Sequence, residues 1–234
     1  MRFHPAPSRS TASPEFSAAP SFVVAGLSPN LVTYSAGLAL QQEAAARLEA
    51  GVDTGTVLAL EHEPVFTAGR RAERNEYPSD GTPVVPVNRG GRVTWHGPGQ
   101  LVVYPVIRLT HGFGGADLVH ALERALIATA AEFGVSGNLI EGRTGVWALP
   151  AAPGPLVPAK FAQIGIHVGR RIVSHGLALN CNNDLSPFDT FTPCGITDAG
   201  VASLTQLAGR TITPADALPA LQVHLAPVLE RFAA

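Results

Sequence analysis

The sequence is poor in charged residues and in long apolar runs. Asp, Glu, Lys and Arg make up 15% of the 234 residues and the formal net charge is −2, which excludes the basic field of a general nucleic-acid binder. No apolar run approaches the roughly 18 residues that span a bilayer. Apolar residues still reach 46%, which excludes a chain disordered throughout. We expect a globular protein with neither nucleic-acid nor membrane partners.

Cysteine is equally scarce, with Cys181 and Cys194 as the two in the chain. Two cysteines form neither a disulfide scaffold nor a Cys-only metal site, and no His-x-x-x-His spacing is present, so we expect no metal. The first 20 residues are rich in Pro, Ser and Ala and lack the apolar core of a signal peptide. We predict a disordered tail over 1–20, a single domain over 21–234 and a cytoplasmic location.

Segments typical of strands outnumber those typical of helices. Helical patterns cover 35–49, a stretch that starts with Asp117 as N-cap and ends at Gly134, and a stretch after Thr213 in which Pro219 and Pro227 predict a kink or a split. The predicted strands are 22–25, 56–62, 84–91, 92–96, 101–109, 145–149, 161–168 and 172–181, with a loop over 63–83 and a hairpin turn at 169–171. Strands in succession with few helices between them favour an α+β fold over a doubly wound sheet.

The densest candidate for a binding site is the glycine-rich segment 89–104. Glycine allows a ligand to approach backbone amides closely, and Arg89, Thr94, His96 and Gln100 supply donors along the same stretch. The same composition is also typical of a hairpin with a glycine-rich turn. The residues alone leave both interpretations open.

Cys194 and Lys160 are the candidates for chemistry. Cys194 lies between a proline and a glycine, where a sharp bend exposes a thiol, and a neighbouring cation or base is needed to make such a thiol reactive. Cys181, in an apolar strand, reads as a core residue. Lys160 is the single lysine among 16 basic residues; arginine cannot give up its proton and a desolvated lysine can, although a GC-rich genome produces the same bias. His96 and His175 are either core residues or bases.

With these residues assembled, the chain resembles the lipoyl(octanoyl) transferase family, the octanoyl-[acyl carrier protein]:protein N-octanoyltransferases. The resemblance covers about residues 30–207, and the family signature is matched by RGGRVTWHGPGQLVVY at 89–104. The other matching segments are 61–70, 145–147, 160–165, 174–180, 184–185 and 193–196. Phe161 departs from the family pattern, in which isoleucine is usual.

The resemblance implies a fold, an activity and a set of site residues. The fold is that of biotin and lipoate protein ligases, a mixed β-sheet flanked by helices. Cys194 is implied as the nucleophile that carries the octanoyl group as a thioester, and Lys160 as the residue that lowers the pKa of that thiol and relays protons, either as an ammonium or as a neutral amine. The implied substrate-binding residues are Arg89, Gly90, Gly91, Arg92, Val93, Thr94, Trp95, His96, Gln163, Ile164, Gly165, Gly176, Leu177 and Ala178.

The same resemblance implies the partners and requires no cofactor. The donor is octanoyl-acyl carrier protein, for which Arg70, Arg71, Arg74 and Arg92 are a candidate landing patch. The acceptors are lipoyl domains of 2-oxoacid dehydrogenase complexes and the glycine cleavage H protein. Three alternatives stay open: an ATP-dependent lipoate- or biotin-type ligase, a cysteine thioesterase that uses His96 or His175, and a non-catalytic acyl-carrier-binding protein.

Overall fold

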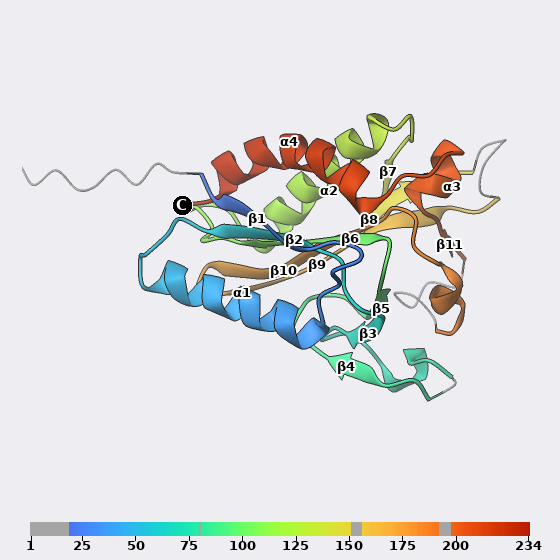
Figure 1. Cartoon of the computed structure of the whole chain (residues 1–234), viewed down its shortest axis with the longest axis horizontal. Helices are drawn as coiled ribbons and strands as arrows, with labels where there is room; N and C mark the ends of the chain where they lie inside the picture. Colours follow the sequence, from blue (N-terminus) through green and yellow to red (C-terminus); the bar gives the residue numbers. More distant parts are fainter. Residues whose placement is uncertain (1–18, 80, 151–155, 192–197) are drawn as a thin grey trace, which may run out of the picture.

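The computed structural model describes residues 19–79, 81–150, 156–191 and 198–234 (Figure 1). The tail predicted over 1–20 therefore lies outside the described residues except for its last two. Cys194 also lies outside them. None of the described helices is long and apolar enough to cross a membrane.

The core of the fold is an eight-stranded mixed sheet, which confirms the predicted α+β class. Its strands follow the order β1-β2-β6-β10-β9-β8-β7, and β11 pairs with β9. The pairing is antiparallel apart from β1 with β2 and β11 with β9. The strands are β1 (Ser21–Gly26), β2 (Thr56–Leu60), β6 (Gln100–Val106), β7 (Asn138–Ile140), β8 (Arg143–Ala148), β9 (Ala159–Gly169), β10 (Ile172–Asn180) and β11 (Gly200–Val201).

Helices cover both faces of this sheet. In Figure 1, α2 (Gly115–Ala131) and α4 (Pro214–Phe232) lie side by side over one face, and α1 (Tyr34–Glu49) lies on the other. Beside α1 sits a three-stranded sheet of order β4-β3-β5, formed by β3 (Val65–Ala68), β4 (Val84–Pro86) and β5 (Val93–His96). The short helices are η1 (Arg74–Glu76), η2 (Ser186–Asp189) and α3 (Leu204–Ala208).

The strand β3 corrects the prediction of a loop over 63–83. Four residues are too few to show a period, and their partners lie far along the chain: β3 pairs with β5 from Val65 opposite His96 to Ala68 opposite Val93. Phe66 packs edge-on against Phe191, with ring centroids 5.5 Å apart. Tertiary packing therefore makes a strand where local sequence signals a loop.

One detail of the helix predictions is wrong, and one of two predicted outcomes for the last helix is excluded. Asp117 is not the N-cap of α2; Gly114 occupies that position, and the Asp117 carboxylate reaches back to accept the Gly114 N–H at 2.8 Å. Of the kink or split predicted after Thr213, the split does not occur, because α4 continues through Pro219 and Pro227. Each proline removes one hydrogen bond, whereas the helix buries an apolar face, and that burial compensates for the loss. The buried apolar residues of this face are Leu218, Leu221, Leu225, Leu229 and Phe232.

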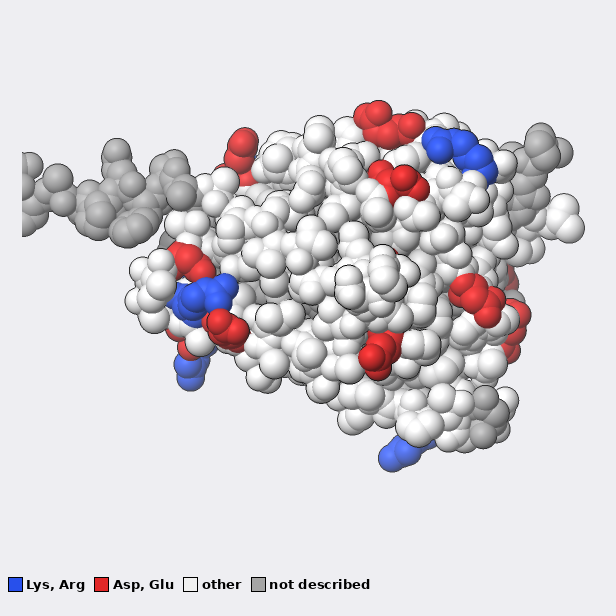
Figure 2. All heavy atoms as spheres, in the orientation of Figure 1, with Lys and Arg blue, Asp and Glu red and all other residues white. Residues whose placement is uncertain are grey.

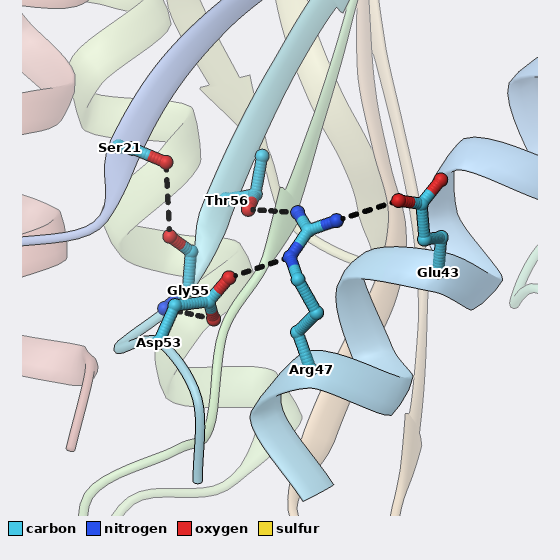
Figure 3. A network of polar contacts seen from close by, with 6 residues as sticks. All are labelled: Ser21, Glu43, Arg47, Asp53, Gly55 and Thr56. Atoms are coloured by element: carbon cyan, nitrogen blue, oxygen red, sulfur yellow. Dashed lines mark hydrogen bonds and ion pairs between the residues drawn. The ribbon is translucent and has the colours of Figure 1, made fainter. Parts of the chain in front are cut away.

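Helix α1 is tied to the sheet at its C-terminal end by Arg47. Its guanidinium donates to Asp53 at 2.8 Å, to Glu43 at 3.0 Å and to Thr56 at 3.1 Å (Figure 3). Asp53 in turn accepts the backbone N–H of Gly55, so helix, loop and strand β2 form one network. Elsewhere charge is sparse: on the face that Figure 2 shows, basic and acidic side chains are scattered across largely uncharged surface.

Candidate active site

The candidate site is a cavity of about 420 Å³ on the side of the main sheet where β8 and β9 separate. The two strands pair from Ala148–Ala159 to Val146–Ala162, and pairing ends there although β9 continues to Gly169. The cavity has residues 142–144 on one side of this split and 163–166 on the other. The glycine-rich residues 89–91, just before β5, also line the cavity. They are attached to β9 by the Gly90 N–H, which donates to Ile166 O at 2.9 Å.

The structure brings most of the predicted site residues to this one cavity. Its lining includes Lys160 and all the predicted substrate-binding residues except Trp95. Trp95 instead packs edge-on against Phe188, with ring centroids 5.9 Å apart, in a separate apolar cluster. Segments 89–96, 163–165 and 176–178 are far apart in the sequence, so their convergence is a property of the sheet topology.

Lys160 lies on β9 and is 7% exposed. Its Nζ is 4.5 Å from the centroid of the Trp147 ring, the residue opposite it on β8. The indole N–H of Trp147 donates to Arg143 O at 3.1 Å, which fixes the ring. An aromatic face favours an ammonium group. Phe161, the departure from the family pattern, does not line the cavity; its side chain is fully buried in the core cluster that includes residues of α2.

A chain of hydrogen bonds assigns the tautomer of His96. Asn180 Nδ2 must donate to the carbonyl of Ala202 at 3.0 Å, which leaves Asn180 Oδ1 to accept from Gln100 Nε2 at 2.9 Å. Gln100 Oε1 then accepts from His96 Nδ1 at 2.7 Å. Burial lowers the pKa of His96 to about 3, so the ring is neutral at pH 7 and its Nε2 is an acceptor in the wall of the cavity.

Sequence reasoning missed three residues of an aromatic and imidazole cluster, in which Tyr34 and His62 lie beside His96 and Tyr104 lies beside His62. Tyr34 stacks on His96 with centroids 6.5 Å apart, and Tyr104 donates its hydroxyl to His62 Nε2 at 2.7 Å. His62 Nδ1 donates to Val32 O at 2.8 Å, and burial lowers the pKa of His62 to about 4. His62 and Tyr104 fall in the segments that resemble the family, and that is the signal that could have found them; Tyr34, at the start of α1, has no local signal.

His175 carries backbone strain at the edge of the cavity. Its φ is +57°, a left-handed conformation that a non-glycine residue adopts at a cost. The strain is held by contacts from other elements: its backbone N–H donates to Gln41 Oε1 of α1 at 2.7 Å, and its Nε2 lies 2.6 Å from Asn88 Oδ1. Burial and the nearby Arg89 cation lower the pKa of His175 to about 4. Helix α1 thereby positions the strand that continues into 176–178.

Acid should destabilise the fold through these three histidines. His62, His96 and His175 have folded pKa values of about 4, 3 and 4, whereas the unfolded chain takes up protons near 6.5. The unfolded state therefore binds more protons between these values, and stability is lost as the pH falls below about 6.5. We expect the free energy of unfolding to be about 4 kcal/mol lower at pH 5.5 than at pH 7.5. Urea unfolding at the two pH values measures this, and equal stabilities would contradict it.

The arginines at the cavity do not form one uniform patch. Arg71, Arg92 and Arg143 line the cavity. Arg92 forms ion pairs with Glu73 and Glu76, and Arg143 donates to Asp198 at 2.8 Å. Arg70 and Arg74, the other two residues of the predicted patch, are exposed and do not line the cavity. Arg74 stacks on Tyr77, with its guanidinium carbon 5.4 Å from the ring centroid.

Cys181 is a core residue, as predicted. It is fully buried in the cluster between the sheet and α2 and α4, and its Sγ contacts Leu179 O at 3.5 Å. Burial raises the pKa of this thiol well above its ordinary value, which makes it unreactive.

Comparisons with known proteins agree on family and fold. Residues 33–226 match the family model of the lipoyl protein ligase A/B catalytic domain. An octanoyltransferase of Clavibacter sepedonicus is 50% identical over 208 residues, which cover 88% of this chain and 90% of that protein.

Two solved structures share the fold at much lower sequence identity. One is a bi-partite lipoate protein ligase from Thermoplasma acidophilum, with a TM-score of 0.61 and 12% identity over 90% of this chain and 84% of that one. The other is the biotin protein ligase from Aquifex aeolicus in complex with biotin and ATP, with a TM-score of 0.54 and 14% identity over 90% and 71%. These confirm the biotin/lipoate protein ligase-like fold.

Proposed function

Since the chain belongs to the family of lipoyl protein ligase A/B catalytic domains and is an acyltransferase of the octanoyltransferase type, we propose that it transfers octanoyl groups from octanoyl-acyl carrier protein to a lysine of lipoyl domains through a thioester on Cys194. The observation that carries this proposal is the convergence of Lys160 with segments 89–94, 163–165 and 176–178 on one cavity. Cys194 follows from the sequence resemblance and lies outside the described residues.

The chemistry runs in two steps. In the first, the Cys194 sulfur attacks the octanoyl thioester of the carrier, its proton passes to the carrier thiolate, and the carrier leaves as a free thiol. In the second, the amine of the target lysine attacks the new thioester, loses a proton and forms an amide, and Cys194 is released as a thiol. Exchange between two thioesters is nearly balanced in energy and amide formation is downhill, so neither step needs ATP.

Lys160 supplies the charge and the proton relay in this scheme. The aromatic face of Trp147 supports the ammonium form, which pairs with the Cys194 thiolate in the first step. In the second step the lysine takes up and returns the proton of the incoming amine. The neutral His96 contributes a hydrogen-bond acceptor to the same cavity rather than a second cation.

The lining of the cavity suits an aliphatic chain with a polar head. Its apolar part includes Val93, Val102, Ile164, Leu177 and Ala178. Burying an alkyl chain there yields about 0.8 kcal/mol per methylene group, so an acyl tail is held mainly by this term.

The partners in this proposal follow from the family resemblance, and the basic residues that line the cavity are consistent with an acidic donor protein. Arg71 is exposed and lines the cavity, and Arg92 and Arg143 stand beside it. Basic side chains beside a binding cavity attract an acidic carrier protein and so favour its productive encounter with the site. Lipoyl domains of 2-oxoacid dehydrogenase complexes and the glycine cleavage H protein are the proposed acceptors.

Transfer without ATP tests the proposed function. The purified chain is mixed with an unmodified lipoyl domain and either octanoyl-acyl carrier protein or free octanoate, each with and without ATP, and the intact masses of the proteins are measured. We expect the lipoyl domain to gain one octanoyl group from the octanoylated carrier at the same rate with and without ATP, and none from free octanoate. Transfer of free octanoate that depends on ATP would identify a ligase, and release of octanoic acid without acceptor modification would identify a thioesterase.

A further inference from the structure

Glu123 is a buried carboxylate that the proposed mechanism does not use. It lies on α2 and is 4% exposed. Its Oε1 accepts the backbone N–H of Gly145 at 2.8 Å, and its Oε2 lies 3.1 Å from His120 Nδ1. Burial of a carboxylate is costly unless it is paired or hydrogen-bonded, so the contact with the backbone of β8 is a specific one.

Gly145 is the residue at which β8 leaves β9. The last paired residue of β8 before the split is Val146, opposite Ala162. At Gly145 the backbone has φ +114°, and its N–H points to Glu123 of the helix layer instead of joining the ladder. A Cβ on Gly145 would lie 2.5 Å from Ala162 O and 3.3 Å from Lys160 Cε, so this turn of the backbone sits directly against the lysine.

Beyond Val146, where the pairing of β8 with β9 ends, the cavity is lined from both strands and from α2. Thr144 of β8 lies on one side and Ile164 and Ile166 of β9 on the other. Val119 lines the cavity from α2, one turn before Glu123 on the same face of the helix. This end of the cavity therefore combines the apolar side chains of Val119, Ile164 and Ile166 with the polar side chains of Thr144 and Gln163, and its width depends on how far apart the strands are held.

We propose that Glu123 is a positioning residue that holds β8 away from β9 and so keeps this cleft open for the far end of the acyl chain. The inference rests on the proposed function for the identity of the acyl group. Without the Glu123 acceptor, the Gly145 N–H is left unpaired in a buried position. The strand packed against Gly145 is β9, since a Cβ built on Gly145 would lie 2.5 Å from Ala162 O. Once released from α2, this part of β8 moves toward β9 and narrows the cleft, which excludes long chains and leaves room for short ones.

Three variants separate positioning from stability. Glu123→Gln keeps an oxygen acceptor of the same reach. Its octanoate-to-butanoate affinity ratio is therefore expected to stay within about threefold of the native value. Glu123→Leu removes the acceptor, and Glu123→Asp shortens its reach while it preserves the charge. Glu132→Leu is the matched control, because Glu132 directly follows α2 and its exposed carboxylate contacts only His224 among the described residues.

The measurement is the affinity for octanoate and for butanoate by titration calorimetry, together with the octanoyl adduct by intact mass. For Glu123→Leu we expect the octanoate-to-butanoate affinity ratio to fall about tenfold, with a smaller fall for Glu123→Asp and none for Glu132→Leu. Melting temperatures show which variants are folded, and Glu123→Asp serves if Glu123→Leu does not fold. An unchanged ratio in a folded variant, or no octanoate preference in the native chain, would overturn the inference. Native chain that binds octanoate but forms no adduct contradicts the proposed function instead.

Discussion

Replacing Cys194 with alanine is expected to abolish the octanoyl adduct that the native chain forms with octanoyl-acyl carrier protein. A thioester needs a sulfur on the enzyme, and no hydrogen-bonding group or charge substitutes for it. The part of the cavity lining that the structure describes, Lys160 included, comes from other segments, so we expect the variant to keep its acyl site and still to bind octanoate. The effect is therefore complete loss of the covalent step, measured by intact mass after incubation with the octanoylated carrier.

The matched control is Cys181→Ser, which changes the other thiol of the chain. Cys181 is fully buried away from the cavity, and its thiol stays protonated because burial raises its pKa. We expect this variant to form the adduct at close to the native rate, with a lower melting temperature because a hydroxyl replaces a sulfur in the core. An adduct that persists in Cys194→Ala and disappears in folded Cys181→Ser would exchange the roles of the two thiols.

Much of the fold follows from local sequence. Composition and periodicity predict the helices over 34–49, 115–131 and 214–232 and the long strands β9 and β10. The missed strand β3 and the unbroken α4 have a common cause. Both depend on partners distant in the chain, one on β5 and the other on the face buried against α2 and the sheet, and such partners are invisible to a local pattern.

The site shows the same division between local and distant information. The glycine-rich segment and the single lysine stand out in the sequence, and resemblance to a family gives them meaning. Nothing local marks Trp147 as the partner of Lys160 or Glu123 as the partner of Gly145, because register and helix packing create those contacts. The tautomer of His96 depends on a chain of bonds that ends at the carbonyl of Ala202, 106 residues away in the sequence.

Lys160→Arg is expected to lower the rate of octanoyl transfer by about 10²- to 10³-fold, the usual contribution of a positioned acid–base group. Arginine keeps the positive charge and stacks on Trp147 at least as well as lysine does, so the attraction for a thiolate survives. What arginine cannot do is release and regain a proton near neutral pH. The variant therefore isolates proton relay from electrostatic pairing, which the native lysine combines.

Single-turnover rates of the two half-reactions make the distinction. If Lys160 relays protons, adduct formation from the octanoylated carrier is slowed in Lys160→Arg, and transfer from a preformed adduct to the lipoyl domain is slowed more, because only the second step must strip a proton from an amine. Lys160→Leu, which removes the charge as well, should be slower still in the first step. Near-native rates for Lys160→Arg in both steps would show that Lys160 acts only as an electrostatic partner of Cys194. The proton relay would then belong to another group of the cavity, and the candidate is the neutral His96, whose Nε2 is a hydrogen-bond acceptor in the cavity wall.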